Sequence, residues 1–126
     1  MKITIPLEPR TKKNSQSIII VKGRPMIIPS KIYKAYEKDC KPFIPKLDNP
    51  IDYEVNVKVK YYMSTHRRVD LVNLLEATCD MLVHYGVLKD DNSKIVASHD
   101  GSEVLYDKEQ PRCEIEITRK IKEFSL

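Results

Sequence analysis

Hydrophobic and polar residues alternate along three stretches of the chain, and this period of two predicts β-strands. Lys2 to Pro6 alternates near the start of the chain, and Arg112 to Ile121 alternates near its end. The clearest case is Tyr53 to Met63 (YEVNVKVKYYM), with tyrosines and valines on one face and charged or amide side chains on the other. We expect these three strands to belong to one sheet. The apolar face of the longest strand is Tyr53, Val55, Val57, Val59 and Tyr61.

Two shorter segments have the composition of a β-hairpin. Ser17 to Val21 (SIIIV) is rich in β-branched residues, and Met26 to Ile28 follows it after the turn sequence Lys22-Gly23-Arg24-Pro25. A further short strand is expected at Lys94 to Ser98, followed by a turn at His99-Asp100-Gly101.

A first helix is predicted after Ser30, which can cap its N-terminus. Ile32, Tyr36 and Cys40 lie close to helical spacing and are its expected apolar positions, and Pro42 ends it.

A second helix is predicted from Asp70 to Tyr85, and it is clearly amphipathic. Gly86 follows at the position where a left-handed cap ends many helices, and Asp90-Asp91-Asn92 forms the next turn. The apolar arc of the helix is Leu71, Leu74, Leu75, Thr78, Met81, Leu82 and Tyr85. The polar arc is Asp70, Asn73, Glu76, Asp80 and His84.

The size and composition fit one globular domain. A chain of 126 residues with 41% hydrophobic and 32% charged residues can bury its own core. The elements predict an α/β (α+β) fold, with a mixed sheet and two main helices. The longest purely apolar run is Ile18 to Val21, so no membrane span is expected. Three widely spaced cysteines favour reduced thiols and a cytoplasmic location.

Charge is distributed unevenly along the chain. Residues 1–69 carry a net charge of +9 and residues 70–126 a net charge of −5. Such a division indicates a part that binds polyanions beside an acidic part. Scattered, solvated charge is the equally ordinary alternative.

The window from His66 to Asp91 holds the candidate chemistry. It contains a basic cluster, the amphipathic helix with acids on its polar arc, and an acidic pair just after the helix. Mg²⁺ is bound by carboxylate oxygens, which Asp70, Asp90 and Asp91 could supply if the chain folds back on itself. The structural alternatives are that Asp70 only caps the helix, with Asn73 at the third helical position, and that Asp90 and Asp91 only form a turn.

Basic residues adjoin these acids. His66, Arg67 and Arg68 immediately precede Asp70, and arginine binds phosphate oxygens through two parallel hydrogen bonds. Ordinary pairing with carboxylates is the alternative role. Further lysines and arginines in the first part of the chain would add a salt-sensitive contact with a nucleic-acid backbone: Lys12, Lys13, Lys22 and Arg24.

The sequence resembles the RusA family of Holliday junction resolvases. Val69 to Ile95 (VDLVNLLEATCDMLVHYGVLKDDNSKI) is similar to the family's acidic helix, glycine turn and Asp-Asp segment. Pro6 to Ser15 (PLEPRTKKNS) is similar to its proline-rich, asparagine-containing N-terminal loop. The order of elements and the length also agree, so the resemblance covers most of the chain.

This resemblance implies a magnesium-dependent endonuclease, with Mn²⁺ as a possible substitute, that acts as a homodimer on four-way DNA junctions in recombination and repair. By the resemblance, Asp70 and Asp91 are the first and last essential carboxylates, Asp90 is the neighbouring acid, and Asn73 is the amide. Hydrolysis by a metal-bound hydroxide would leave 5′-phosphate and 3′-hydroxyl ends. The expected DNA contacts are Lys12, Lys13, Asn14, His66, Arg67 and Arg68.

Two positions depart from the family's D-x-D-N-L pattern and its following lysine. Val72 stands at the second acidic position and Glu76 at the lysine position. Side chains on a helix lean toward its N-terminus, so Glu76 points back over the turn that holds Val72. We therefore hypothesise that Glu76 restores the missing ligand, which gives the metal set Asp70, Glu76, Asp91 and Asp90. The alternative is a branched-DNA-binding protein with the same fold and no cleavage.

Overall fold

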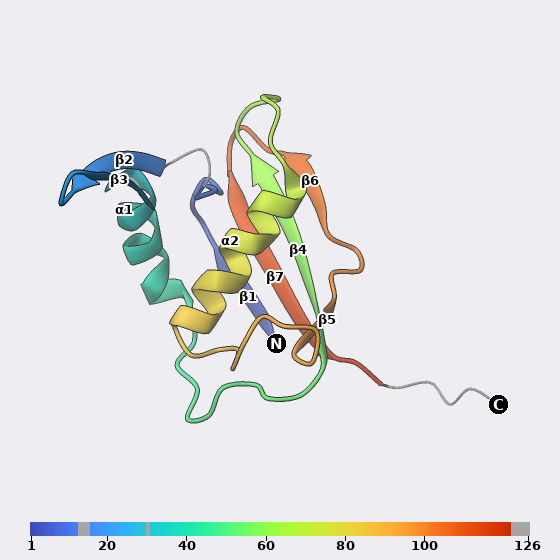
Figure 1. Ribbon diagram of the computed structural model, residues 1–126. Helices are drawn as coiled ribbons and strands as arrows, with labels where there is room; N and C mark the ends of the chain where they lie inside the picture. The colour runs from blue at the N-terminus through green and yellow to red at the C-terminus, as the bar shows by residue number, and fades with distance from the viewer. Residues whose placement is uncertain (13–15, 30, 122–126) are drawn as a thin grey trace.

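The computed structural model describes residues 1–12, 16–29 and 31–121 of the chain. Within these residues the chain forms one mixed sheet, a separate two-stranded hairpin and two α-helices (Figure 1). This is the α+β arrangement that the sequence predicts.

The long alternating segment forms β4 (Val55–Met63), the strand with the most partners in the sheet. It pairs antiparallel with β7 (Arg112–Arg119) and parallel with both β5 (Val96–Ser98) and β6 (Glu103–Tyr106). The strand β1 (Lys2–Ile5) pairs antiparallel with the other edge of β7. The first and last strands therefore lie side by side, although they are more than 100 residues apart in the sequence.

The apolar face of β4 is buried beneath α2 (Leu71–His84), which crosses the sheet in Figure 1. Burial along β4 alternates residue by residue, because successive side chains of a strand point to opposite faces. The hydroxyl groups of Tyr61 and Thr78 lie 2.6 Å apart and link this face to the helix inside the core. The open face of the sheet carries the charged side chains of β4 and β7.

The hairpin consists of β2 (Gln16–Val21) and β3 (Arg24–Pro29), as predicted. Lys22 and Gly23 make its turn with positive φ angles of 51° and 76°. Figure 1 shows the hairpin beside α1 and away from the main sheet. Ile20 is 78% exposed near the end of this hairpin.

The first helix, α1 (Lys31–Cys40), is followed by the short 3₁₀ helix η2 (Lys41–Phe43). Its buried residues are Tyr33, Tyr36 and Cys40. The prediction that Ile32 belongs to the buried face of this helix is wrong, because its side chain is 58% exposed. Tyr33 replaces it, since the two tyrosines and Cys40 share one side of the helix at a spacing of three and four residues. Ser30, the expected cap, lies outside the described residues.

Two residues that the sequence predicts to lie within strands, Tyr53 and Ile121, lie outside them. Tyr53 precedes β4, is 39% exposed and has the guanidinium of Arg119 over its ring at 4.4 Å. Ile121 lies beyond the end of β7 and is 85% exposed. The strand β6 was not predicted. No helix among the described residues is both long and apolar enough to cross a membrane.

Candidate functional site

The N-terminus of α2 is built around Asp70. Its backbone is extended, and its Oδ1 accepts a hydrogen bond from the Val72 amide at 3.0 Å, so it caps the helix. A cap of this kind satisfies one of the amide groups that have no partner in the first turn. Asp70 is exposed, and Oδ2 forms no hydrogen bond within the part of the chain that the structure describes. One carboxylate oxygen is therefore held by the fold while the other remains available.

A line of three adjoining hollows runs past this cap, and we call it the basic groove. The first hollow lies between β6 and the segment after β4, the second against the N-terminal loop, and the third around Asp70 and Asn73. Arg67 lines the first two hollows and Arg68 the last two, so each hollow adjoins the next. The charged side chains along the groove are Glu8, Arg10, Arg67, Arg68 and Asp70, and His66 lies among them.

Glu8 links the N-terminal loop to the segment that follows β4. Its carboxylate accepts hydrogen bonds from the backbone amide of Ser64 at 3.1 Å and from the Ser64 hydroxyl at 2.8 Å. This contact occupies the acid, whereas Arg10, Arg67 and Arg68 form no ion pair among the described residues. The groove therefore presents three exposed guanidinium groups, which are suited to phosphate oxygens.

A second group of acids lies farther along α2. Asp80 accepts a hydrogen bond from Lys12 at 2.9 Å, which ties the N-terminal loop to the polar side of the helix. Burial raises the pKa of Asp91, and its hydrogen bond with Asp90 and the negative charge of Asp80 raise that pKa further. The same two charges, of Asp91 and Asp80, add to the burial that raises the pKa of Cys79 to about 12. The charge of Asp91 therefore interacts with that of Asp80.

The segment after α2 carries Asp90 and then bends at Asp91 and Asn92, while the turn itself lies at 93–95, slightly later than predicted. Leu88 forms a parallel bridge with Ile51, and the Lys89 amide donates to the Ile51 carbonyl at 2.9 Å. Asp90 then accepts from the Asp91 amide at 2.7 Å, and this backbone hydrogen bond holds the pKa of Asp90 below its usual range.

The two acidic regions are separated along the helix. Ten residues of α-helix span about 15 Å, so Asp70 lies far from Asp80. The segment that carries Asp91 follows the other end of α2 (Figure 1). Glu76 is exposed between them, one turn before Asp80. Carboxylate oxygens are the donors that Mg²⁺ prefers. Nevertheless, residues 1–12, 16–29 and 31–121 contain no group of three Asp, Glu, His or Cys side chains placed to hold a metal ion. The set Asp70, Glu76, Asp90 and Asp91 thus does not form a metal site in the single chain as described.

The predicted basic residues have different positions. His66, Arg67 and Arg68 are exposed along the groove. The ammonium group of Lys12 is paired with Asp80. Lys13 and Asn14 lie outside the described residues.

Three residues of these regions are given no site role by the sequence analysis. Asp80 is on the predicted polar arc, at a spacing of four from Glu76, but only the structure shows its ion pair with Lys12. Arg10 belongs to the basic loop that the sequence shows. Tyr106, whose ring stacks on His66 with centroids 3.9 Å apart, gave no signal because β6 itself was not predicted.

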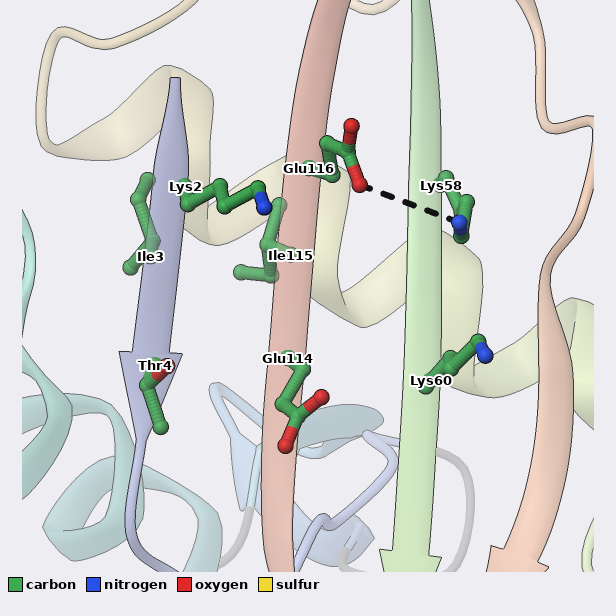
Figure 2. Close-up of a pocket in the computed structure, with 8 residues that line it drawn as sticks. All are labelled: Lys2, Ile3, Thr4, Lys58, Lys60, Glu114, Ile115 and Glu116. Atoms are coloured by element: carbon green, nitrogen blue, oxygen red, sulfur yellow. Dashed lines mark ion pairs between the residues drawn. The ribbon is translucent and has the colours of Figure 1, made fainter.

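Another hollow lies on the open face of the sheet, on the opposite side from α2 (Figure 2). Charged side chains stand side by side on adjacent strands there, and Lys58 pairs with Glu116 at 3.7 Å. Lys60 similarly pairs with Glu103 at 4.0 Å. Alternating signs of this kind stabilise neighbouring strands, so we assign this face a structural role.

Comparison with known proteins gives one positive finding. A family model described as endodeoxyribonuclease RusA matches residues 6–118, which include the N-terminal loop, the basic groove, α2 and the Asp90-Asp91 segment. No curated protein matches the chain.

Proposed function

The chain belongs to the RusA family of endodeoxyribonucleases, and from this premise we propose that it is a divalent-metal-dependent endonuclease that cuts four-way DNA junctions. The observation that carries the proposal is the family match, which spans nearly the whole chain. The basic groove supports it, because its three guanidinium groups lead to the exposed carboxylate of Asp70. Phosphate contacts beside an acidic group are what a phosphodiesterase site needs.

We propose the following roles. Arg67, Arg68 and His66 bind the DNA backbone, together with Lys12, Lys13 and Asn14, while Asn73 orients a ligand. Asp70, Asp91, Glu76 and Asp90 are the proposed ligands for Mg²⁺ or Mn²⁺. The separation between Asp70 and Asp91 has to close before both can bind one ion, so metal binding by this chain requires its own test.

The wider setting is also a proposal. A nuclease that cuts both strands of a junction symmetrically needs two sites, which a homodimer would supply. Light scattering should then give about twice the 14.7 kDa mass of the chain. The expected role is in DNA recombination and repair, in the cytoplasm.

A second candidate is a protein that binds branched DNA without cutting it. Two observations favour it: Val72 is 69% exposed on α2 at a position where the family pattern has an acid, and Glu76 stands where that pattern has a lysine. The absence of a three-carboxylate group among the described residues agrees with this candidate.

One experiment separates the two candidates. A labelled four-way junction is incubated with the protein in Mg²⁺ and, in parallel, in EDTA. Paired nicks that require Mg²⁺ support the nuclease, whereas a mobility shift without nicks supports the binding protein. If the protein neither cuts nor shifts the junction, both candidates are wrong.

The variant Asp70→Asn tests the site within that assay. Asparagine caps a helix about as well as aspartate, so the fold should be preserved. We expect cleavage to fall by about 100-fold or more while junction binding stays close to that of the wild type. Asp52→Asn is the matched control, because Asp52 is exposed before the start of β4 while the groove lies beyond its end. Normal cleavage by Asp70→Asn would contradict the assigned role.

A further inference from the structure

Two aromatic rings form an exposed stack at one end of the basic groove. The rings of His66 and Tyr106 are stacked, with centroids 3.9 Å apart and planes inclined by 25°. Tyr106 is the last residue of β6 and pairs with Met63, the last residue of β4. The Asp107 amide donates to the Met63 carbonyl at 2.8 Å and fixes this corner. The stack is therefore held by the sheet on one side.

This stack is accessible from solvent. Tyr106 is 45% exposed, and His66 is exposed as well. The hollow beside them is lined also by Arg67 and Val104. Arg67 and Arg68 are shared with the next two hollows, the last of which surrounds Asp70. An aromatic surface thus stands at one end of a groove whose other end carries the helix cap.

Aromatic surfaces flanked by arginines are the combination that binds unstacked nucleotides. The arginines bind the phosphates, and the rings stack on a base whatever its identity. In an uninterrupted duplex both faces of each base are covered by neighbouring base pairs. A base face becomes available only where stacking is interrupted, as at a branch point. A stacking surface beside a phosphate-binding groove therefore discriminates between branched and continuous DNA.

We propose that the His66–Tyr106 stack is a binding site for a nucleobase that is exposed at a DNA branch point. The proposal rests on the proposed function, since it assumes that the groove binds DNA, and it names how branched DNA is selected. The strand's phosphates lie against Arg67 and Arg68, and the base next to them stacks on the two rings. Tyr106 is then a specificity-determining residue for branched DNA.

Binding measured in EDTA, where no cleavage occurs, tests the stack. The dissociation constants of the full-length protein are determined for a four-way junction and for a linear duplex of the same sequence. Base stacking on an aromatic ring changes affinity by about 10-fold. We expect Tyr106→Leu to bind the junction about 10-fold more weakly and the duplex equally well. Tyr106→Phe keeps the ring and should bind both as the wild type does.

A fluorescent base reports on the contact itself. With 2-aminopurine at the branch point, wild-type protein and Tyr106→Phe should change the fluorescence, and Tyr106→Leu should not. The same probe in the middle of an arm should respond to none of the proteins. The control variant is Tyr53→Leu, since Tyr53 is similarly exposed but packs against Arg119 beyond the other end of β4.

The possible failures are distinguishable. If Tyr106→Leu melts like the wild type and prefers the junction over the duplex as strongly as the wild type does, the stack has no part in selecting branched DNA and the proposal is wrong. If Tyr106→Phe is as weak as Tyr106→Leu, the hydroxyl rather than the ring is responsible, which also overturns it. If the wild-type protein binds neither DNA, the proposed function fails together with this inference.

Discussion

Several acidic residues of this protein make hydrogen bonds that stabilise the fold, and these bonds limit which of their oxygens can bind another ligand. Asp70 uses Oδ1 to cap α2, so only its second oxygen is available for another ligand. The Asp80 carboxylate accepts from Lys12, and the carboxylate of Glu8 accepts from Ser64. Glu76 differs from these, because it is an exposed acid without such a contact among the described residues. An acid held by no structural contact on the polar side of α2 is a candidate for chemistry.

The first residue-scale prediction concerns Glu76. If this side chain supplies the missing ligand, Glu76→Gln should lower junction cleavage about 100-fold. Binding of the junction should stay equal or become tighter, because a negative charge near phosphates is removed. Gel assays of nicking and of mobility measure the two effects separately. Glu109→Gln is the control on an exposed loop, and cleavage at the wild-type rate by Glu76→Gln would contradict the ligand exchange.

The second residue-scale prediction concerns pH and stability. The Arg112 guanidinium donates to Asp107 at 2.8 Å, and together with the backbone amides of residues 109 and 110 it lowers the pKa of that carboxyl group. A lowered pKa stabilises the fold above the unfolded pKa of 3.8, and this stabilisation is lost as the pH falls through the folded value.

Asp107→Asn should therefore melt at a lower temperature than the wild type at pH 7, and the difference should shrink below pH 4. Thermal unfolding followed by circular dichroism at several pH values measures this. The exposed Asp48→Asn serves as the control. A difference between Asp107→Asn and wild type that is constant with pH would show that charge is not the cause.

At the scale of elements, the end of α2 determines where the acidic segment after it begins. Gly86 has a φ of 77°, and the Val87 amide then donates back to the Leu82 carbonyl at 2.8 Å. This left-handed cap directs the chain toward Ile51, where Leu88 pairs before the Asp90-Asp91 segment. The position of the acids thus depends on one glycine.

We predict that Gly86→Ala destabilises the protein by about 1 kcal/mol. A Cβ at this position would meet no atom within 4 Å, so the cost is that of the backbone conformation alone. Gly86→Asn should lose less stability than Gly86→Ala, since asparagine adopts the left-handed region more readily than alanine does. Denaturant titration of the three proteins gives the free energies of unfolding. Equal losses for alanine and asparagine would contradict this explanation.

Elements with a strong period could be predicted from the sequence, and those without one could not. The alternation of β4 and the amphipathic arc of α2 are both observed. The strand β6 was missed because most of its four residues are exposed and no alternation is visible. The face of α1 was misassigned because Ile32 and Tyr33 are both apolar neighbours, and only tertiary packing decides which one is buried.

At the scale of the whole molecule, contacts between distant segments decide the site, and local patterns do not contain them. The pairing of β1 with β7 and of β6 with β4 could not be predicted, since strand order depends on the complete sheet. For the same reason the sequence could list Asp70 and Asp91 as candidates without giving their separation. The grouping of Arg10 with Arg67 and Arg68 likewise follows from the tertiary contact between Glu8 and Ser64.

The arrangement of charge over the whole molecule gives the last prediction. The basic groove and the open face of the sheet carry basic residues with different partners. Arg67 and Arg68 line the groove without ion pairs among the described residues, whereas Lys58 and Lys60 on the open face are paired with glutamates. Each phosphate contact contributes about 0.9 to the slope of log affinity against log salt concentration, because it releases counterions.

The double variant Arg67→Ala/Arg68→Ala should therefore reduce this slope for junction DNA by about two. The double variant Lys58→Ala/Lys60→Ala removes the same charge from the open face of the sheet, outside the groove, and should leave the slope unchanged. Fluorescence anisotropy between about 50 and 200 mM salt measures both. If the two variants show the same slope, DNA affinity depends on the net charge of the protein and not on contacts in the groove. Because long-range attraction would affect both variants alike, only direct contact with phosphates produces a difference between them.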